Sequence, residues 1–373
     1  MELVTEVIAS GAGLEAIRPA WDVLAVAAAR PYSSPGWMIP WWRHASPEGA
    51  RLHAVAAYDG DKLVGLAPMW LTPGGFGRSE QRVLAARLAA PASPLAEPGR
   101  EPEVAAALAP ALATAPGAGT IRFEGHAGEP DWPQVLADAW PGRRPWIHSA
   151  LPTPAPTVAL EGLDYESWLA TKSSKFRSEA RRVRRRLEEA GGRFSMAGPE
   201  DIDRVLDAFL RLHEARWSTR GGSTALIPGL PAMLREAAGE MIPSGRMRIY
   251  TIEADGEFVC VLIQLVAGGE VGSWNVGFDE KWGEYSPAFQ MLLYAIGDAM
   301  ERGDRRVDLG PGAQHYKLRL ADSQMEVDTV TLVRRGAAYP LDRAKLAPYQ
   351  ARWMLSRRVP PDMKRRLKRL VRG

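Results

Sequence analysis

The two halves of this 373-residue chain repeat one order of helix, strand, tight turn and strand. Helical patterns at 14–29 and 202–217 are each followed, after a loop, by a strand, an Asp-Gly turn and a second strand. The turns at Asp59 and Asp255 lie 196 residues apart, and Asp-Gly between two strand patterns is a strong β-hairpin signal. Outside these elements the halves do not match. The pattern favours two tandem α+β domains, with two unrelated α+β domains as the alternative.

A proline-rich segment lies between the halves. Leu151–Pro156 has three prolines in six residues, which is typical of a linker. The length fits two to three domains of about 100–200 residues. We therefore expect an N-terminal domain at 1–150, a second domain at 157–340 and a basic helical tail at 341–373. The aromatic segment 32–42 is expected to be a loop.

Charge is distributed unevenly along the chain. The formal net charge is +3, but residues 334–373 carry +11, residues 172–186 carry +7, and the remainder carries −15. The N-terminus has no secretory pattern and no apolar run approaches the roughly 20 residues that span a bilayer, so we expect a cytoplasmic protein. The tail, 341–373, could contact an anionic membrane surface or nucleic acid; a solvated basic helix is the alternative.

The composition limits the chemistry. The single cysteine, Cys260, excludes an internal disulfide framework and a cysteine-based zinc cluster. The six histidines show no metal-ligand spacing, so we expect no metal.

The second half carries the more informative order of elements. A helical stretch and a helix at 201–217 precede three strand patterns, a helix that begins at Ser286-Pro287, and a short strand that ends in Gly310-Pro311-Gly312. This order resembles the GCN5-related N-acetyltransferase (GNAT) fold. The residues resemble the CelD-like acyltransferases, whose architecture is related to the Fem-type aminoacyltransferases with two GNAT-like halves. The resembling segments are SKFRSEARRVRRRLEE (174–189), LHEARWSTRGG (212–222), WNVGFDEKW (274–282), YSPAFQ (285–290) and DLGPGAQHYKLRLAD (308–322).

The resemblance covers about residues 165–335 and implies a fold and an activity. It implies an α+β fold of two tandem GNAT-like domains, with mixed sheets flanked by helices. The implied activity is N-acyl transfer from acyl-CoA, such as acetyl-CoA, or from an acyl carrier to an amine by direct attack. The acceptor would be a small molecule or an amino sugar. Two alternatives stay open: Fem-like transfer from aminoacyl-tRNA, and a non-catalytic scaffold in polysaccharide or envelope assembly.

Donor binding is expected at the helix that begins after Ser286. Many GNAT enzymes hold the coenzyme A pyrophosphate with a glycine-rich loop, whereas the matching stretch here, DEKWGEYSP (279–287), has one glycine. The free N–H groups of a helix N-terminus still attract an anion. Glu280 and Glu284 lie nearby and would repel phosphate, which leaves acyl-CoA, a carrier protein and aminoacyl-tRNA open as donors. The resemblance assigns donor contacts to Asn275, Gly277, Gly283, Tyr285 and Ser286.

Three residues are candidates for the chemistry. Amide formation needs a neutral amine, a polarised carbonyl and correct alignment. Asp308, at a strand end, is expected to take the proton of the amine, or else to cap the following turn. By resemblance to Fem-type enzymes, Lys317 would polarise the acyl carbonyl and Tyr316 would line the donor channel. The alternative is a surface lysine beside a packed tyrosine.

A further group of residues is expected to bind substrate. Arg177 and Arg181 lie on one face of the basic helix and could grip phosphates of an acceptor, a carrier protein or tRNA. The alternative is a solvated face paired with Glu188 and Glu189. Other candidates are two cleft-shaping residues and a possible second base: Arg216, Trp217 and His315.

Overall fold

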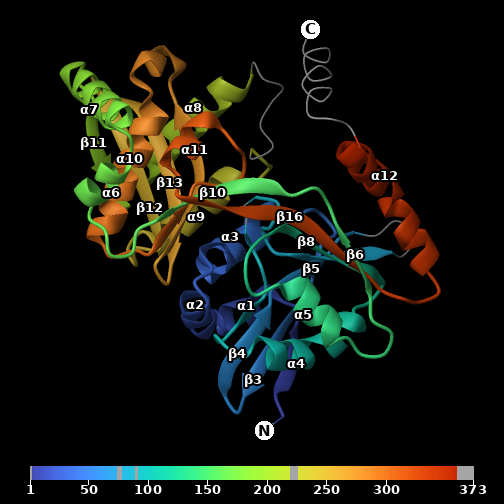
Figure 1. The fold of residues 1–373 in the computed structure, drawn as a ribbon. Helices are drawn as coiled ribbons and strands as arrows, with labels where there is room; N and C mark the ends of the chain where they lie inside the picture. The colour runs from blue at the N-terminus through green and yellow to red at the C-terminus, as the bar shows by residue number, and fades with distance from the viewer. Residues whose placement is uncertain (1, 74–77, 89–90, 219–225, 359–373) are drawn as a thin grey trace.

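Two α+β halves share one long sheet that runs through the whole molecule (Figure 1). The computed structural model describes residues 2–73, 78–88, 91–218 and 226–358. The strand order of the long sheet is β11-β12-β13-β14-β15-β10-β16-β8-β6-β5-β2, with β9 paired to β16. The strands from β11 to β10 come from the C-terminal half, and the strands from β8 to β2 come from the N-terminal half.

The C-terminal half is built around a parallel strand pair. β14 and β15 are parallel neighbours, and α10 connects them across one face of the sheet. The elements of this half are β10 (Thr153–Ala159), α6 (Tyr165–Thr171), α7 (Ser174–Glu189), β11 (Arg193–Met196), α8 (Ile202–Ser218), α9 (Leu230–Met241), β12 (Met247–Ala254), β13 (Glu257–Ala267), β14 (Glu270–Phe278), η4 (Glu280–Tyr285), α10 (Pro287–Glu301), β15 (Arg306–Asp308), α11 (His315–Leu320), β16 (Ser323–Val333) and α12 (Tyr339–Arg358), with η3 at Pro199–Asp201.

The N-terminal half repeats the parallel pair. β6 and β8 are parallel neighbours, and the chain passes from one to the other through α4, as it passes through α10 in the other half. A separate four-stranded sheet has the order β1-β3-β4-β7. The elements are β1 (Val4–Ile8), α1 (Gly11–Ala16), α2 (Arg18–Ala27), η1 (Pro31–Ser33), α3 (Pro35–Ala45), β2 (Arg51–Leu52), β3 (Ala54–Asp59), β4 (Lys62–Ala67), β5 (Met69–Leu71), β6 (Ser79–Val83), β7 (Leu95–Ala96), α4 (Glu101–Ala113), β8 (Ala118–His126), α5 (Trp132–Asp138) and β9 (Trp146–Ser149).

One strand joins the two halves. β16 pairs with β10 at its beginning and with β8 and β9 toward its end. The segment 151–156 was expected to be an irregular linker. That prediction is wrong, because β10 begins at Thr153 and pairs with both β15 and β16. Its prolines do not interrupt the pairing, since the register continues through Pro154 and Pro156.

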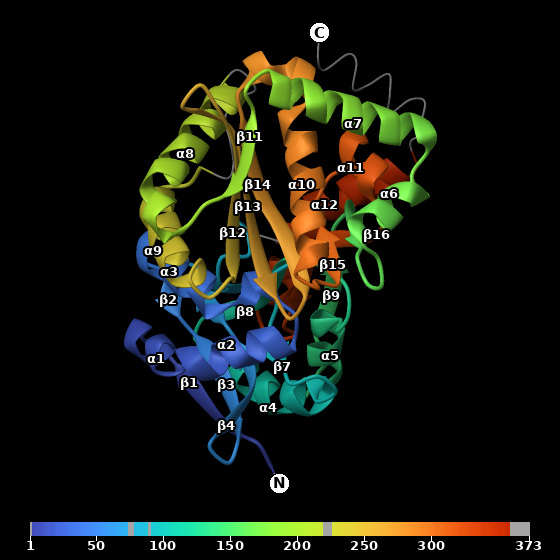
Figure 2. The ribbon, with the colours of Figure 1, turned by 90° about the vertical axis from the view of Figure 1, so that its left-hand side faces the viewer.

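Two hydrophobic cores lie on opposite faces of the C-terminal strands. The larger core is continuous between the halves: Trp21 and Trp37 belong to the same cluster as Phe209 and Leu265. The second core lies between the sheet and α10 and includes Val307. Figure 2 shows α8 and α10 on different sides of these strands.

Three sequence-based predictions differ from the structure. The helix expected at 14–29 is divided into α1 and α2, because Pro19 lacks a backbone N–H and starts a new helix. The aromatic segment expected as a loop forms η1 and most of α3, whose first residue, Pro35, has the φ of a helix start. The basic helix is interrupted at Lys172 and begins anew at Ser174, after Ser173, whose side chain caps the new helix by accepting the N–H of Phe176.

The C-terminal tail is partly described. α12 runs from Tyr339 to Arg358, and buried Asp342 forms an ion pair with Arg78 of the N-terminal half. Residues 359–373 of the predicted basic tail lie outside the described residues. Within the described part of the chain, no helix combines the length and the apolar character that crossing a bilayer requires.

Candidate active site

The site lies where β14 and β15 separate. Their parallel pairing ends at Gly272 and Asp308, while β14 continues to Phe278. One residue later, β14 bulges against β13, because Ser273 and Asn275 pair with consecutive residues and leave Trp274 unpaired. Bulges of this kind redirect side chains beside active sites.

Asp308 is buried at the end of β15. Its Oδ1 accepts the N–H of Gly310 at 2.8 Å, so the carboxylate caps the turn, as the alternative in the sequence analysis proposed. Its Oδ2 is buried without a hydrogen-bond partner among the described residues. Burial raises the pKa of Asp308 to about 6, opposed by the Gly310 N–H and the charge of Lys317. One oxygen is therefore committed to structure and the other is available for a proton.

Lys317 is a buried residue of α11, not the surface lysine that the alternative expected. Its Nζ donates to the carbonyl oxygens of Gly310 (3.0 Å) and Pro311 (3.2 Å). Burial lowers the pKa of Lys317 to about 8, while Asp308 acts in the opposite direction. An ammonium group has three donors, so one N–H remains beyond the two that hold the loop.

A cavity of about 330 Å³ opens at the N-terminus of α10. Two of the predicted donor contacts, Gly283 and Ser286, line it together with Tyr316. Burial raises the pKa of Tyr316, so its hydroxyl stays protonated near neutral pH. The first residues of α10, from Pro287 to Gln290, line part of this donor cavity. Pro287 has no N–H, and the N–H groups of Phe289 and Gln290 donate to the carbonyl oxygen of Ser286 (3.0 and 3.1 Å), so of these four residues Ala288 offers its N–H to an anion, together with the positive end of the helix dipole.

The other predicted donor contacts do not line the donor cavity. Tyr285 contacts the ring of Trp282 (5.4 Å between centroids). The Oδ1 of Asn275 accepts the N–H of Val276 at 3.0 Å. Gly277 faces α8, where an added Cβ would lie 3.1 Å from the carbonyl oxygen of Phe209. The glycine therefore allows helix and sheet to approach closely.

The predicted repulsion from Glu284 is reduced by an ion pair. Arg186 Nη2 lies 2.7 Å from Glu284 Oε2, and the guanidinium is 5.3 Å from the ring of Tyr285. The pair connects α7 to η4 beside the donor cavity. Arg186 thus offsets the negative charge of Glu284 near the position expected for the anion.

The predicted substrate residues do not gather at one place. Arg216 lines the donor cavity, with its guanidinium 4.5 Å from the ring of Phe278, and Trp217 lies next to it at 5.9 Å. His315 is exposed in the first turn of α11. Arg177 donates to the carbonyl oxygens of Ala170 and Lys172 and so closes the end of α6.

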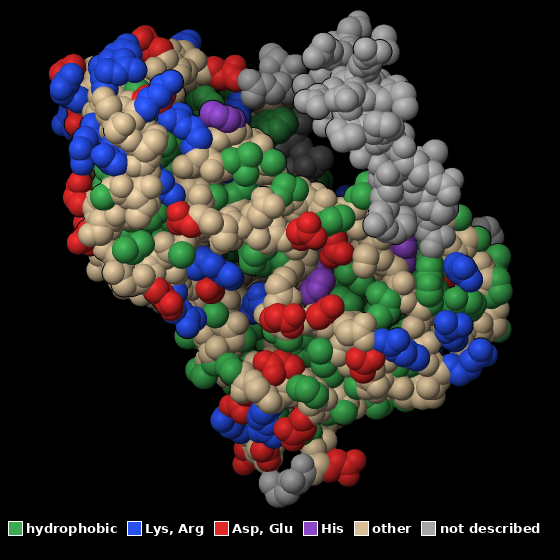
Figure 3. All heavy atoms as spheres, viewed as in Figure 1, with side chains coloured by type: hydrophobic (Ala, Val, Ile, Leu, Met, Phe, Trp, Pro, Cys, Tyr) green, Lys and Arg blue, Asp and Glu red, His purple; other side chains and the backbone are tan. Residues whose placement is uncertain are grey.

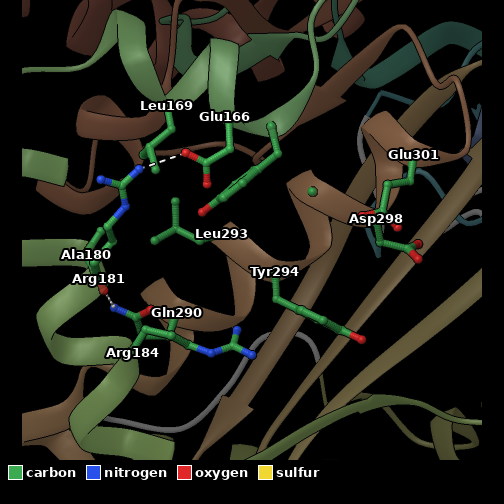
Figure 4. A pocket seen from close by; sticks show the side chains of 12 residues that line it. Glu166, Leu169, Ala180, Arg181, Arg184, Gln290, Leu293, Tyr294, Asp298 and Glu301 are labelled. Carbon is green, nitrogen blue, oxygen red and sulfur yellow. Dashed lines mark hydrogen bonds and ion pairs between the residues drawn. The ribbon is translucent and has the colours of Figure 1, made fainter.

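Arg181 belongs to a different cavity. It pairs with Glu166 at 2.7 Å beside a cavity of about 320 Å³ between α6, α7 and α10 (Figure 4). Lys and Arg side chains gather on the surface over α7 (Figure 3). Arg184 and Arg185 pair with Glu188 and Glu189, as the alternative for this face expected.

The sequence analysis did not single out Arg319, a residue that lines the donor cavity. Its guanidinium lies 5.1 Å from the ring of Phe176 and 5.4 Å from that of Phe289, and it pairs with Glu179 at 2.7 Å. Arg319 follows Lys317 by two residues in the DLGPGAQHYKLRLAD segment. Its position within that segment is the sequence feature that could have identified it as a candidate.

A second cavity touches the loop between β15 and α11. A cavity of about 320 Å³ is lined by Pro311 of the β15–α11 loop and by two carboxylates, Glu124 and Asp328. Burial raises the pKa of Asp328 to about 6, with Asp131 and Glu326 adding to the effect. Within the described part of the chain, no group of three or more His, Cys, Asp or Glu side chains is arranged to hold a metal ion.

Comparison with known proteins finds a family model that matches part of the chain. Residues 174–318 match the acetyltransferase (GNAT) domain family. No curated protein sequence matches the chain.

Solved structures share the fold over most of the chain. FemX superposes with a TM-score of 0.61 at 11% identity, covering 91% of this chain and 99% of FemX. The C-terminal domain of a putative lysylphosphatidylglycerol synthetase from Agrobacterium fabrum gives 0.58 at 12% identity, covering 90% of this chain and 97% of that domain. At these identities the likeness shows the fold. Residues 174–318 therefore match a GNAT acetyltransferase domain, and the chain as a whole shares its fold with FemX and with the synthetase domain.

Proposed function

We propose that the protein transfers an acyl group from a thioester, acyl-CoA or an acyl carrier, to an amine. The observation that carries this proposal is the buried pair of Asp308 and Lys317 at the point where β14 and β15 separate. In this proposal Oδ2 of Asp308 accepts the proton, and the remaining N–H of Lys317 polarises the acyl carbonyl.

The proposed step is direct attack without a covalent enzyme intermediate. The amine nitrogen forms a bond to the thioester carbon, the C–S bond breaks, and Asp308 takes the proton that the nitrogen loses. The thiolate leaves and is protonated to the free thiol. With a pKa of about 6, Asp308 is largely ionised at neutral pH and can accept that proton.

The donor cavity supports a phosphate-bearing donor. Arg216 and Arg319 flank the N-terminus of α10, and both a helix N-terminus and guanidinium groups bind phosphate. The thioester would then extend from this cavity toward the Gly310-Pro311 turn. Gly283 and Ser286 are proposed contacts to the donor, and Tyr316 lines its path.

The acceptor is proposed to enter from the opening beside Pro311. Glu124 in that cavity lies 3.9 Å from Arg87, which also lines it, so Asp328 is the carboxylate that favours a positively charged amine over an acidic acceptor. This supports an amine as the nucleophile.

We propose the division at about residue 150 as a boundary between two structural repeats.

A panel of donors tests the proposal. The protein is incubated with acetyl-CoA, longer acyl-CoA, acylated carrier protein and charged tRNA, and thermal stabilisation is followed by free thiol release with a set of amines. We expect stabilisation by a thioester donor. Stabilisation by charged tRNA alone, with a steep salt dependence, would favour the Fem-like alternative, and no shift with any donor would favour a scaffold.

A further inference from the structure

Tyr32, in the N-terminal half, is held rigidly against the C-terminal sheet. It lies in η1, is 2% exposed, and packs on β13 and β14. The next residue fixes this turn: Ser33 accepts the indole N–H of Trp21 on its carbonyl oxygen (2.8 Å), and its hydroxyl exchanges hydrogen bonds with the backbone of Ser93 (2.9 and 3.0 Å). Such a network leaves the phenol little freedom to move.

Gly272 shows where the phenol ends. A Cβ added at Gly272 would lie 2.6 Å from the hydroxyl oxygen of Tyr32, so the ring occupies the space of the missing side chain. Gly272 is the direct partner of Asp308 in the parallel pairing of β14 and β15. Directly paired residues on neighbouring strands project to the same face. The Tyr32 hydroxyl and the Asp308 carboxylate are therefore neighbours on one face of the sheet.

The alternation of side chains supports this placement. Val271 and Val307, each one residue earlier, belong to the core on the opposite face with α10. Tyr32 belongs to the core between the halves. The negative charge of Asp308 also adds to the effect of burial in raising the pKa of Tyr32, which requires the two groups to be near.

On this face, one carboxylate oxygen of Asp308 lacks a hydrogen-bond donor among the described residues. Its Oδ1 is taken by the Gly310 N–H, whereas its Oδ2 has no hydrogen-bond partner among the described residues. A buried carboxylate oxygen without a donor is costly. A phenol hydroxyl can donate one hydrogen bond to such an oxygen.

We propose that Tyr32 is a positioning residue for the reaction: its hydroxyl donates through one bridging water to Oδ2 of Asp308, and so orients the carboxylate for the amine. The inference rests on the proposed function in assigning the proton to Asp308. It gives the N-terminal half a part in the site, because the hydroxyl comes from one half and the carboxylate from the other.

Replacing Tyr32 by phenylalanine tests the proposal. The full-length Tyr32→Phe protein keeps the ring and loses the hydroxyl, so the carboxylate loses a donor and its pKa rises. We expect the acidic limb of the kcat/KM profile to move upward by about one pH unit. Tyr58→Phe, at a partly exposed site whose hydroxyl lies 3.4 Å from Glu6, is the matched control and should leave the profile unchanged.

A second measurement separates this proposal from the proposed function. Infrared titration of the carboxyl band, with Asp308→Asn as the blank, follows Asp308 without turnover. We expect the same upward shift in Tyr32→Phe. An unchanged Asp308 titration in a folded Tyr32→Phe protein overturns the role of Tyr32, whereas an infrared shift in a protein that never transfers an acyl group would contradict the proposed function alone.

Discussion

The carboxylate of Asp308 serves two purposes with its two oxygens. One oxygen holds the turn that follows β15, through the Gly310 N–H, and the other lies buried without a partner among the described residues. The first use keeps the side chain in place, and the second leaves a base of raised pKa beside the gap between β14 and β15. Structure and proposed chemistry are thus carried by one side chain.

The raised pKa of Asp308 predicts a specific dependence of stability on pH. The folded-state pKa of about 6 lies above the usual value of 3.8, so the folded protein binds the proton more tightly than the unfolded chain. Stability from this group is present at low pH and is lost as the pH rises toward 6. Relative to wild type, Asp308→Asn should therefore gain on the order of 2 kcal/mol of unfolding free energy between pH 4 and pH 7.

Urea denaturation at several pH values measures this difference. The Asn oxygen can still accept the Gly310 N–H, which makes the substitution a fair comparison. Asp61→Asn, at an exposed turn, is the control and should follow wild type. A constant difference between Asp308→Asn and wild type across this range would contradict the raised pKa.

Lys317 should produce an alkaline limit to turnover. Its pKa is lowered to about 8 by burial, so its charge is lost as the pH rises through that value. If the charge polarises the acyl carbonyl, kcat should fall above about pH 8. Lys317→Met should lower kcat by about tenfold or more and remove the alkaline limb, the fall of kcat above about pH 8. Persistence of the limb in Lys317→Met would assign it to another group.

At the scale of elements, the N-terminus of α10 and helix α11 together form the donor cavity. α10 supplies the wall from Pro287 to Gln290, and α11 supplies Tyr316 and Arg319. Ser286 occupies the position before the helix, as expected from its sequence, but it adopts a left-handed conformation (φ 48°) and its side chain makes no capping hydrogen bond. Its hydroxyl is therefore not used by the helix.

Arg319 is expected to contribute to donor affinity. Arg319→Ala should weaken acyl-CoA binding by about tenfold or more, because a charge-assisted hydrogen bond to phosphate contributes about 1.5–3 kcal/mol. Isothermal titration at two salt concentrations measures the change. Arg185→Ala, whose side chain is 72% exposed and pairs with Glu189, is the control. Equal affinities for Arg319→Ala and wild type would exclude Arg319 from the phosphate site.

Elements with strong local signals were predictable from the sequence. The Asp-Gly turns gave the correct hairpins β3–β4 and β12–β13, and Ser286-Pro287 marked the start of α10. β10 was not predictable, because its prolines indicate a linker and only pairing with β15 and β16 makes it a strand. Local propensity is a weak guide where long-range pairing decides the structure.

The candidate site could be assembled from the sequence only in part, for a similar reason. Asp308 and Lys317 lie in one segment and could be found from its motif. Tyr32 lies 276 residues before Asp308, and nothing in the local sequence indicates that its ring covers Gly272. Contacts between the halves depend on the shared core, which the sequence does not reveal.

At the scale of the whole molecule, the halves are joined by a shared core and a shared strand. Trp274, the bulged residue of β14, donates its indole N–H to the carbonyl oxygen of Leu88 at 2.8 Å. Its ring packs edge-on against that of Trp37, 5.2 Å away. β16 pairs with strands of both halves. These contacts should make the two halves unfold together.

Trp37→Ala tests this coupling. Removing this fully buried ring should cost about 3–5 kcal/mol. Because the core is continuous, hydrogen exchange should accelerate in β13 and β14 as well as in α3. Acceleration confined to the N-terminal half would show that the halves are independent folding units.

The central claim is that Asp308 accepts the amine proton during acyl transfer at the junction of β14 and β15. Its most direct test is the rate of thiol release from the acyl-CoA and amine pair selected by the donor panel, measured from pH 5 to pH 9 for wild type and Asp308→Asn. We predict a wild-type rate that falls below about pH 6, and a loss of about 10²–10⁴-fold in a folded Asp308→Asn protein. An unchanged rate and pH profile in Asp308→Asn would contradict the claim.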